Sequence, residues 1–193
     1  MPNPSVITDM DVGVKKIIDC LNNKEIIGIF GDYDVDGATS TAILGNYFKS
    51  INHPFEIYIP DRQKEGYGPS IEGFTKLIDK NVKTIITVDC GTSSYETINY
   101  AKKKKVETIV LDHHQAHIKL PNALAIINPN RIDDKSNLNY LCAAGICLMF
   151  LVSLNQKLRA LKWFENKKIV EPNIFTFLDL VCLGTVCDVV PLL

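Results

Sequence analysis

Residues 26–37 read IIGIFGDYDVDG, an apolar run that ends abruptly in a glycine- and aspartate-rich loop. The apolar part, 26–30, has the length and composition of a buried strand. Two later apolar runs end in the same way, because 84–88 leads into Asp89-Cys90-Gly91 and 108–111 leads into Asp112-His113-His114. A buried strand followed by an acidic loop is therefore the recurring unit of this chain, and it decides the fold.

Amphipathic segments separate these strands. Patterning predicts helices over 10–21, 39–49, 70–80 and 94–105, strands over 55–59 and 123–127, and two apolar helices over 141–161 and 174–183. Ser70 is the expected N-cap of the helix over 70–80. Strands that alternate with helices of this length form parallel sheets, and right-handed crossovers place helices on both faces. We expect an α/β fold with a doubly wound, mainly parallel sheet.

Composition limits the function classes. The chain has 193 residues, of which 46% are hydrophobic and 22% charged, as in one soluble globular domain. The longest apolar stretch, 146–152, is far shorter than the ~20 residues that span a bilayer. The acidic N-terminus lacks the pattern of a signal peptide, so we expect a cytoplasmic protein without a membrane partner. A net charge of −1 argues mildly against nucleic-acid binding, although acidic residues at a metal site can offset a basic groove.

The cysteines and one lysine run have two interpretations each. None of the six cysteines forms a C-x-x-C pair, and the pairs Cys142/Cys147 and Cys182/Cys187 lie in apolar stretches. Free thiols that pack in the core are the main interpretation, and a zinc site is the alternative. The run Lys102–Lys105 is expected to be a solvated helix end, with DNA contact as the alternative.

The polar loops predict a metal site. Ligands of an open parallel sheet bind beyond the carboxyl ends of its strands, so all three loops would meet at one edge. In an extended segment Asp34 and Asp36 would face the same way, and Asp89 would join them from another strand. Carboxylates ~4 Å apart repel by about 4 kcal/mol per pair at an effective dielectric near 20. Either some bind protons or the site binds cations, and the adjacent imidazoles favour Mn²⁺, with Mg²⁺ or Zn²⁺ as alternatives.

Several residues in these loops have competing interpretations. Asp32 is either a turn residue or a weak metal ligand. Asp112 is expected to orient a histidine rather than to bind metal directly, and His114 has packing or hydrogen bonding as its alternative role. A calcium loop is excluded, because the twelfth position counted from Asp32 is Ile43 and not glutamate.

Four residues outside the loops complete these expectations. Thr39 and Ser40 are expected to begin a helix near the site, where free backbone N–H groups would favour an anionic substrate. His53 and His117 lie outside the polar clusters and are expected at the surface.

The set Asp34-Val35-Asp36-Gly37, Asp89-Cys90-Gly91 and Asp112-His113-His114 is similar to the signature of the DHH phosphoesterase family. The similarity covers nearly the whole chain. The stretches 31–44, 59–68, 88–94 and 183–192 resemble the branch of single-strand DNA exonucleases within that family. This resemblance implies two divalent metal ions, with Mn²⁺ favoured and Mg²⁺ as the alternative.

The resemblance also implies residue roles. Asp34 would hold one metal, and Asp89 would bridge to a second metal that is held by Asp36, His113 and Asp188. The implied catalytic residues are Asp89, His113 and His114, with His114 close to the scissile phosphate. Arg62 resembles a substrate-phosphate contact. Phe30 departs from pyrophosphatase-type members, which carry a histidine there, so the first metal would bind more weakly and Asp32 would partly compensate.

The function implied by the resemblance is metal-dependent 5′→3′ hydrolysis of single-stranded DNA to 5′-mononucleotides, in DNA repair and recombination. The implied partners are single-stranded DNA, a single-stranded-DNA-binding protein and a helicase. Residues 1–193 would form a truncated catalytic domain without the DHH-associated and OB-fold domains, so weak activity is expected. The alternatives are a DHH hydrolase of oligonucleotides, phosphoadenosine phosphate, cyclic dinucleotides or pyrophosphate, a non-catalytic DHH scaffold, and a metal-free α/β domain.

Overall fold

One parallel sheet organises the computed structural model, which describes residues 2–192. Its strands lie in the order β2-β1-β3-β4-β5, and each neighbouring pair is parallel. Their bounds are β1 Ile27–Gly31, β2 Phe55–Tyr58, β3 Thr84–Val88, β4 Glu107–Leu111 and β5 Ala125–Ile127. The prediction of a doubly wound, parallel α/β fold is confirmed.

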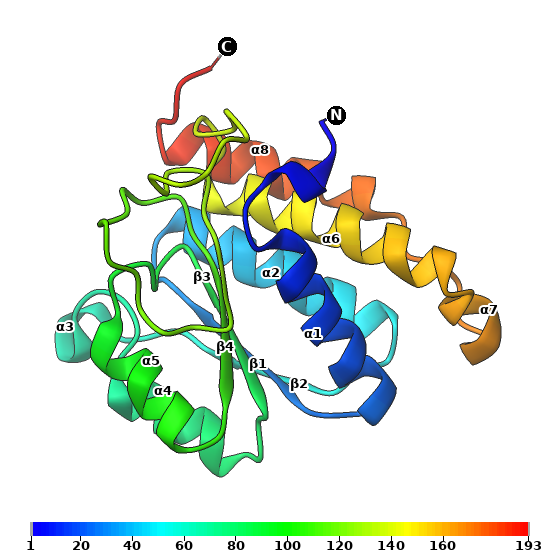
Figure 1. The fold of residues 1–193 in the computed structure, drawn as a ribbon, viewed down its shortest axis with the longest axis horizontal. Helices are drawn as coiled ribbons and strands as arrows, with labels where there is room; N and C mark the ends of the chain where they lie inside the picture. The colour runs from blue at the N-terminus through cyan, green and yellow to red at the C-terminus, as the bar shows by residue number, and fades with distance from the viewer. Residues whose placement is uncertain (1, 193) are drawn as a thin grey trace.

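Helices cover both faces of the sheet (Figure 1). One face carries α1 Met10–Asn23, α2 Val35–Ser50 and α6 Ala143–Ala160, and the other carries α4 Ile71–Asp79 and α5 Tyr95–Lys103. Helix α8, Leu178–Cys187, packs on α2 and α6 as an outer layer. Sequence periodicity missed the short helices α3 Arg62–Glu65 and α7 Trp163–Lys167, which have too few turns to show it, and the 3₁₀ turn Pro4–Val6. The segment expected as one helix over 174–183 is a 3₁₀ turn, Ile174–Phe177, followed by α8, which ends at Cys187.

Alternate residues of the strands face opposite sides of the sheet, where one large core lies on one face and two smaller clusters lie on the other. Ile27 and Ile29 of β1 face the core under α1, α2 and α6. Phe30 faces the other side, where its ring centroid lies 5.5 Å from Tyr58 and 5.6 Å from Phe74. Strands β1, β3 and β5 are buried throughout, which explains why they read as unbroken apolar runs rather than alternating ones.

Capping decides where two of the helices begin. Ser70 caps α4 as predicted, because its Oγ accepts a hydrogen bond from Gly73 N at 3.0 Å. The start expected for the helix over 39–49 was wrong. This helix, α2, begins at Val35 and not at Thr39, because Asp34 caps it by accepting a hydrogen bond from Gly37 N at 2.9 Å. The segment from Asp34 to Asp36 is therefore a helix start and not the extended segment that the sequence suggested.

The strand order creates a crevice at one edge of the sheet. From β1 the chain crosses to the edge strand β2, and it then returns past β1 to form β3 on the other side. The connections after β1 and β3 therefore diverge at their carboxyl ends, where doubly wound sheets bind ligands. The loops that begin at Asp32 and Asp89 both open into this crevice.

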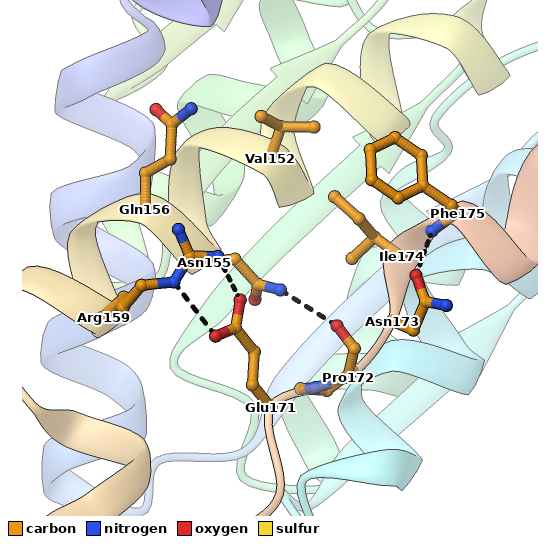
Figure 2. A pocket seen from close by; sticks show the side chains of 9 residues that line it. All are labelled: Val152, Asn155, Gln156, Arg159, Glu171, Pro172, Asn173, Ile174 and Phe175. Carbon is orange, nitrogen blue, oxygen red and sulfur yellow. Dashed lines mark hydrogen bonds and ion pairs between the residues drawn. The ribbon is translucent and has the colours of Figure 1, made fainter.

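A separate surface pocket of about 440 Å³ lies where the segment 171–175 packs against α6 (Figure 2). An ion pair between Arg159 and Glu171 crosses it, and Asn155 Nδ2 donates to Pro172 O at 3.1 Å. Asn155 Oδ1 also accepts from Tyr47 OH at 2.6 Å, which ties α6 to α2. These hydrogen bonds and the ion pair join the segment 171–175 and α2 to α6.

Several smaller expectations meet the structure here. His53 is buried, with a ring nitrogen 2.8 Å from Glu25 O, so its expected surface position was wrong, whereas His117 is exposed. Cys142 and Cys147 lie in the core, but Cys182 and Cys187 are exposed on α8. Within residues 2–192, no helix has both the length and the apolar character that crossing a membrane requires.

Gly184 allows α8 to approach α2 closely. A Cβ atom at Gly184 would lie 2.6 Å from Asp36 Oδ1 and 2.9 Å from Thr39 Oγ1. We expect Gly184→Ala to lower the free energy of unfolding by about 1–3 kcal/mol through overpacking, measured by urea denaturation. The matched change Gly45→Ala within α2 meets no atom closer than 3.4 Å. It should stabilise the helix by about 0.5–1 kcal/mol, and equal effects of the two changes would contradict the close approach.

Candidate metal centre

The β1–α2 connection holds two acidic side chains through a tight turn. Asp34 uses Oδ1 to cap α2, and Asp32 is buried with an Oδ1 atom that has no hydrogen-bond partner. A Cβ atom at Gly37 would lie 2.6 Å from the backbone oxygen of Asp32, so this turn has room only for glycine. Burial raises the pKa of Asp32, and the neighbouring charge of Asp34 adds to that effect.

Asp36 binds the N-terminus of a helix far away in the sequence. Its Oδ2 accepts from Ala143 N at 2.6 Å and its Oδ1 accepts from Ala144 N at 2.9 Å, at the start of α6. The side chain of Cys142, the N-cap of α6, makes no capping bond, so Asp36 takes over that role. The positive end of the helix dipole stabilises the negative charge of this buried carboxylate.

Asp89 extends the acidic cluster from the end of β3. Its φ of 60° lies in the left-handed region, which few residues other than glycine adopt, and its side chain is 1% exposed. Its Oδ1 has no hydrogen-bond partner. Burial, followed by the charges of Asp36 and Asp34, raises the pKa of Asp89 to about 10. A carboxyl group in this position lacks the counter-charge that would let it ionise.

His113 points into the same space from the end of β4. Its Nε2 lies 3.3 Å from Asp89 Oδ1, 3.5 Å from Asp188 Oδ2 and 3.9 Å from Asp36 Oδ2. Although three carboxylates are this close, Nε2 makes no hydrogen bond with any of them. The imidazole nitrogen and the carboxylates therefore surround a common space instead of pairing with one another.

Asp188 reaches the site because α8 packs closely on α2. It is the C-cap of α8, and its N–H donates to Gly184 O at 2.9 Å, one turn earlier. Burial raises the pKa of Asp188, an effect that the nearby His113 opposes. The absence of a Cβ at Gly184 thus decides how far Asp188 enters the crevice.

The side chains form three overlapping groups, each with ligand atoms within 4.8 Å of one another. They are Asp32-Asp34-Asp89, Asp36-His113-Asp188 and Asp89-His113-His114. Buried polar atoms nearly always have a partner, yet among residues 2–192 Asp32 Oδ1, Asp89 Oδ1 and His113 Nε2 find none. Divalent cations would satisfy these atoms and balance the carboxylates, and mixed oxygen and imidazole donors suit Mn²⁺. The residues present therefore fit a two-cation centre.

Asp112 lies behind the histidines and belongs to none of these groups. Its Oδ1 lies 2.7 Å from His114 Nδ1, and its Oδ2 accepts from Thr92 N at 2.9 Å. Burial alone would raise the pKa of Asp112, but the bonds from His114 and Thr92 outweigh it and lower that pKa to about 2. In return, the hydrogen bond that His114 donates to Asp112 raises the pKa of His114, whose side chain is 47% exposed at the rim of the crevice.

Tyr67 is a neighbour of the site that sequence analysis missed. Its hydroxyl lies 3.3 Å from Asp89 O and 3.2 Å from His114 Nε2. The signal was present in Gly66-Tyr67-Gly68, where both glycines have positive φ and present the ring at a turn. Arg62, which was singled out, lies instead at the rim, with its guanidinium 5.2 Å from the centroid of the Tyr33 ring.

Three other expectations need correction or placement. Thr39 and Ser40 are buried inside α2, so their backbone N–H groups are not free to bind an anion, and Thr39 Oγ1 donates to Val35 O at 2.8 Å. Phe30 is buried in the core on the α4 face and offers no ligand. Lys102 and Lys103 lie in the last turn of α5, Lys104 and Lys105 come directly after it, and all four are exposed, as expected of a solvated helix end.

The chain is similar to known proteins in sequence and in fold. The model of the DHH family, N-terminal domain, matches residues 26–185. The chain is 38% identical over 185 residues to the single-stranded-DNA-specific exonuclease RecJ of Escherichia coli (strain K12), an alignment that covers 93% of this chain and 32% of the relative. Identity to RecJ of Dickeya dadantii (strain 3937) is also 38%, over 89% of this chain and 30% of the relative. The chain thus spans about a third of the length of these relatives.

The fold also matches a crystal structure of exonuclease RecJ bound to manganese. The TM-score is 0.81 at 27% sequence identity, and the match covers 99% of this chain and 45% of that one. Because the family model spans most of the chain and includes the loops from Asp32 to His114, the chain belongs to the DHH family, whose N-terminal domain it contains.

Proposed function

We propose that this chain is the catalytic domain of a metal-dependent exonuclease that hydrolyses single-stranded DNA from the 5′ end to 5′-mononucleotides. The observation that carries the proposal is the convergence of unpaired buried atoms, Asp89 Oδ1 and His113 Nε2, with the carboxylates of Asp36 and Asp188. The names of the relatives, which are single-stranded-DNA-specific exonucleases, support the choice of substrate.

The overlapping groups support a division of ligands between two cations. We propose that Asp34, assisted by Asp32, holds the first, and that Asp36, His113 and Asp188 hold the second. Asp89 lies 3.3 Å from His113 and also belongs to the group of Asp32 and Asp34, so it would be shared. Mn²⁺ is the favoured ion and Mg²⁺ the alternative, since both appear in solved RecJ structures.

When bound, two such cations lower the pKa of a water molecule and neutralise charge on the phosphate oxygens. The protein itself would supply orientation and a hydrogen-bond donor. Asp36 stays fixed on the α6 N-terminus, so its group keeps its geometry. His114, with its pKa raised by Asp112 and its ring half exposed, would donate a hydrogen bond to a phosphate oxygen. Tyr67 and Arg62 would contact the substrate at the rim of the crevice.

The wider role follows the relatives and is also a proposal. The enzyme would act in DNA repair and recombination, with a single-stranded-DNA-binding protein and a helicase as partners. Its free cysteines suit the reducing cytoplasm, where we propose that it acts. A non-catalytic scaffold is disfavoured because such scaffolds need no buried, unpaired acidic and imidazole atoms, whereas this chain keeps them at a cost in stability.

A substrate panel tests the proposed reaction. With Mn²⁺, the protein should release 5′-mononucleotides from a single-stranded oligonucleotide and leave a blunt duplex intact, and EDTA should stop the release. Cyclic dinucleotide, phosphoadenosine phosphate, pyrophosphate and dinucleotide serve as comparison substrates in the same assay. Faster turnover of any of these than of the oligonucleotide would replace the proposed substrate with that one.

Asp34 allows its capping role to be separated from its charge. Asn and Asp cap helices equally well, so Asp34→Asn should keep the stability of the metal-free protein, whereas Asp34→Ala should lose about 1 kcal/mol. Both changes remove the carboxylate, so both should weaken Mn²⁺ binding in calorimetry. Wild-type Mn²⁺ affinity in Asp34→Asn would mean that Asp34 serves only as a helix cap.

Asp89→Asn tests the shared ligand. Because burial and the neighbouring carboxylates keep Asp89 protonated in the metal-free protein, a neutral amide of the same shape should leave the metal-free variant about as stable as the wild type. The rise in melting temperature that Mn²⁺ gives the wild type should disappear, together with hydrolysis. Asp19→Asn, an exposed acidic position on α1, is the matched control and should change neither. A persistent Mn²⁺-induced rise in Asp89→Asn would refute the shared role.

A further inference from the structure

Side chains alone hold the loop that carries the two histidines. The dipeptide His113-His114 has four backbone polar groups, and in the part of the chain that the structure describes none of them pairs with another backbone group. Asp112 Oδ1 accepts from His113 N at 2.8 Å and from His114 N at 3.1 Å. Both N–H groups are therefore satisfied by the preceding side chain, and the carbonyl groups need other donors.

Two asparagines donate to those carbonyl groups. Asn128 Nδ2 donates to His114 O at 2.8 Å, and Asn130 Nδ2 donates to His113 O. Both asparagines lie directly after β5, in the sequence Asn128-Pro129-Asn130. Residues that follow β5 thus hold the loop that follows β4.

Asn128 is built into the core behind the site. It is fully buried, its Nδ2 also donates to Thr92 Oγ1 at 2.9 Å, and its Oδ1 accepts from Asn130 N at 2.8 Å. Thr92 in turn donates its backbone N–H to Asp112. The side chains of Asn128 and Asp112 are therefore joined through Thr92, which follows the loop of Asp89. One network reaches the ends of β3, β4 and β5.

From this network we infer that Asn128 and Asn130 are positioning residues for the proposed hydrolysis, each acting through one histidine. Asn130 holds the carbonyl group of His113, so it fixes the orientation of the His113 ring, a proposed metal ligand. Asn128 holds the carbonyl group of His114, so it fixes the orientation of the His114 ring, which would face the phosphate. The inference rests on the proposed function for its kinetic consequences, but the orientation of the rings is a property of the metal-free protein.

The two roles predict different losses. Groups that orient metal ligands are worth about 10–100-fold in metal affinity or activity. Asn130→Ala should therefore raise the Kd for Mn²⁺ about 10–100-fold in calorimetry, because His113 loses its support. Asn128→Ala should lower kcat about 10–100-fold at saturating Mn²⁺, with a smaller change in Kd and little change in KM.

A second readout does not depend on bound metal. The chain contains four histidines, so their imidazole signals are resolvable by NMR in the metal-free protein. The signal of His113 should move most in Asn130→Ala and that of His114 most in Asn128→Ala, while those of His53 and His117 should stay. Should the fully buried Asn128→Ala fail to fold, the half-buried Asn130→Ala still provides the test.

Asn155→Ala is the matched control. Asn155 is also a buried asparagine with an Nδ2 bond to a carbonyl oxygen, but it lies on α6 at the pocket of Figure 2. Its replacement should cost stability, through the unpaired Tyr47 hydroxyl, without changing Mn²⁺ affinity, kcat or the His113 and His114 signals.

The outcomes separate the two hypotheses. If Asn128→Ala and Asn130→Ala match Asn155→Ala in Mn²⁺ affinity, kcat and imidazole signals, the asparagines only stabilise the fold and the inference is wrong. If the wild type neither binds Mn²⁺ nor hydrolyses DNA, the proposed function fails. In that case the imidazole signals alone decide whether the asparagines position the rings.

Discussion

Repulsion among buried carboxylates is the constraint on which the site depends. Asp36 and Asp89 are almost completely buried, and in the described part of the chain neither has a lysine or arginine partner. The fold holds them against their repulsion by separate devices: the N-terminus of α6 for Asp36, the cap of α2 for Asp34, and a left-handed backbone for Asp89. A protein that buries these acidic groups without counter-charges gives up stability that bound cations would restore.

Close backbone approach makes the crowding possible. Gly37 lets the chain turn against the backbone of Asp32, and Gly184 lets α8 reach the carboxylate of Asp36. Both glycines lie in stretches that resemble the DHH exonucleases, and both have a structural reason to be glycine. The close packing of α8 on α2 also places Asp188, the C-cap of α8, at the site, so the same contact serves packing and ligand placement.

Hydrogen bonds behind the site give it rigidity. Asp112, Thr92, Asn128 and Asn130 form a connected network in which the buried asparagine uses both ends of its amide. Sites whose supporting side chains are themselves fixed keep ligands within the small tolerance that metal coordination needs. The exposed rim, with Arg62 on Tyr33 and Tyr67 beside His114, has fewer such bonds and is free to adjust to a substrate.

The local sequence pattern determined where the strands lie in the chain. The strands 27–31, 84–88 and 107–111 each end where an acidic loop begins. It also showed the candidate residues, since the parallel sheet gathers loops at one edge. It misjudged the start of α2, because a cap at Asp34 depends on a single side chain, and it missed α3 and α7, which are shorter than two turns.

Only tertiary structure decided that Asp36 binds α6, that Gly184 admits Asp188, and that the end of β5 holds the histidine loop. Those contacts join residues far apart in the chain, and periodicity carries no information about partners at that distance.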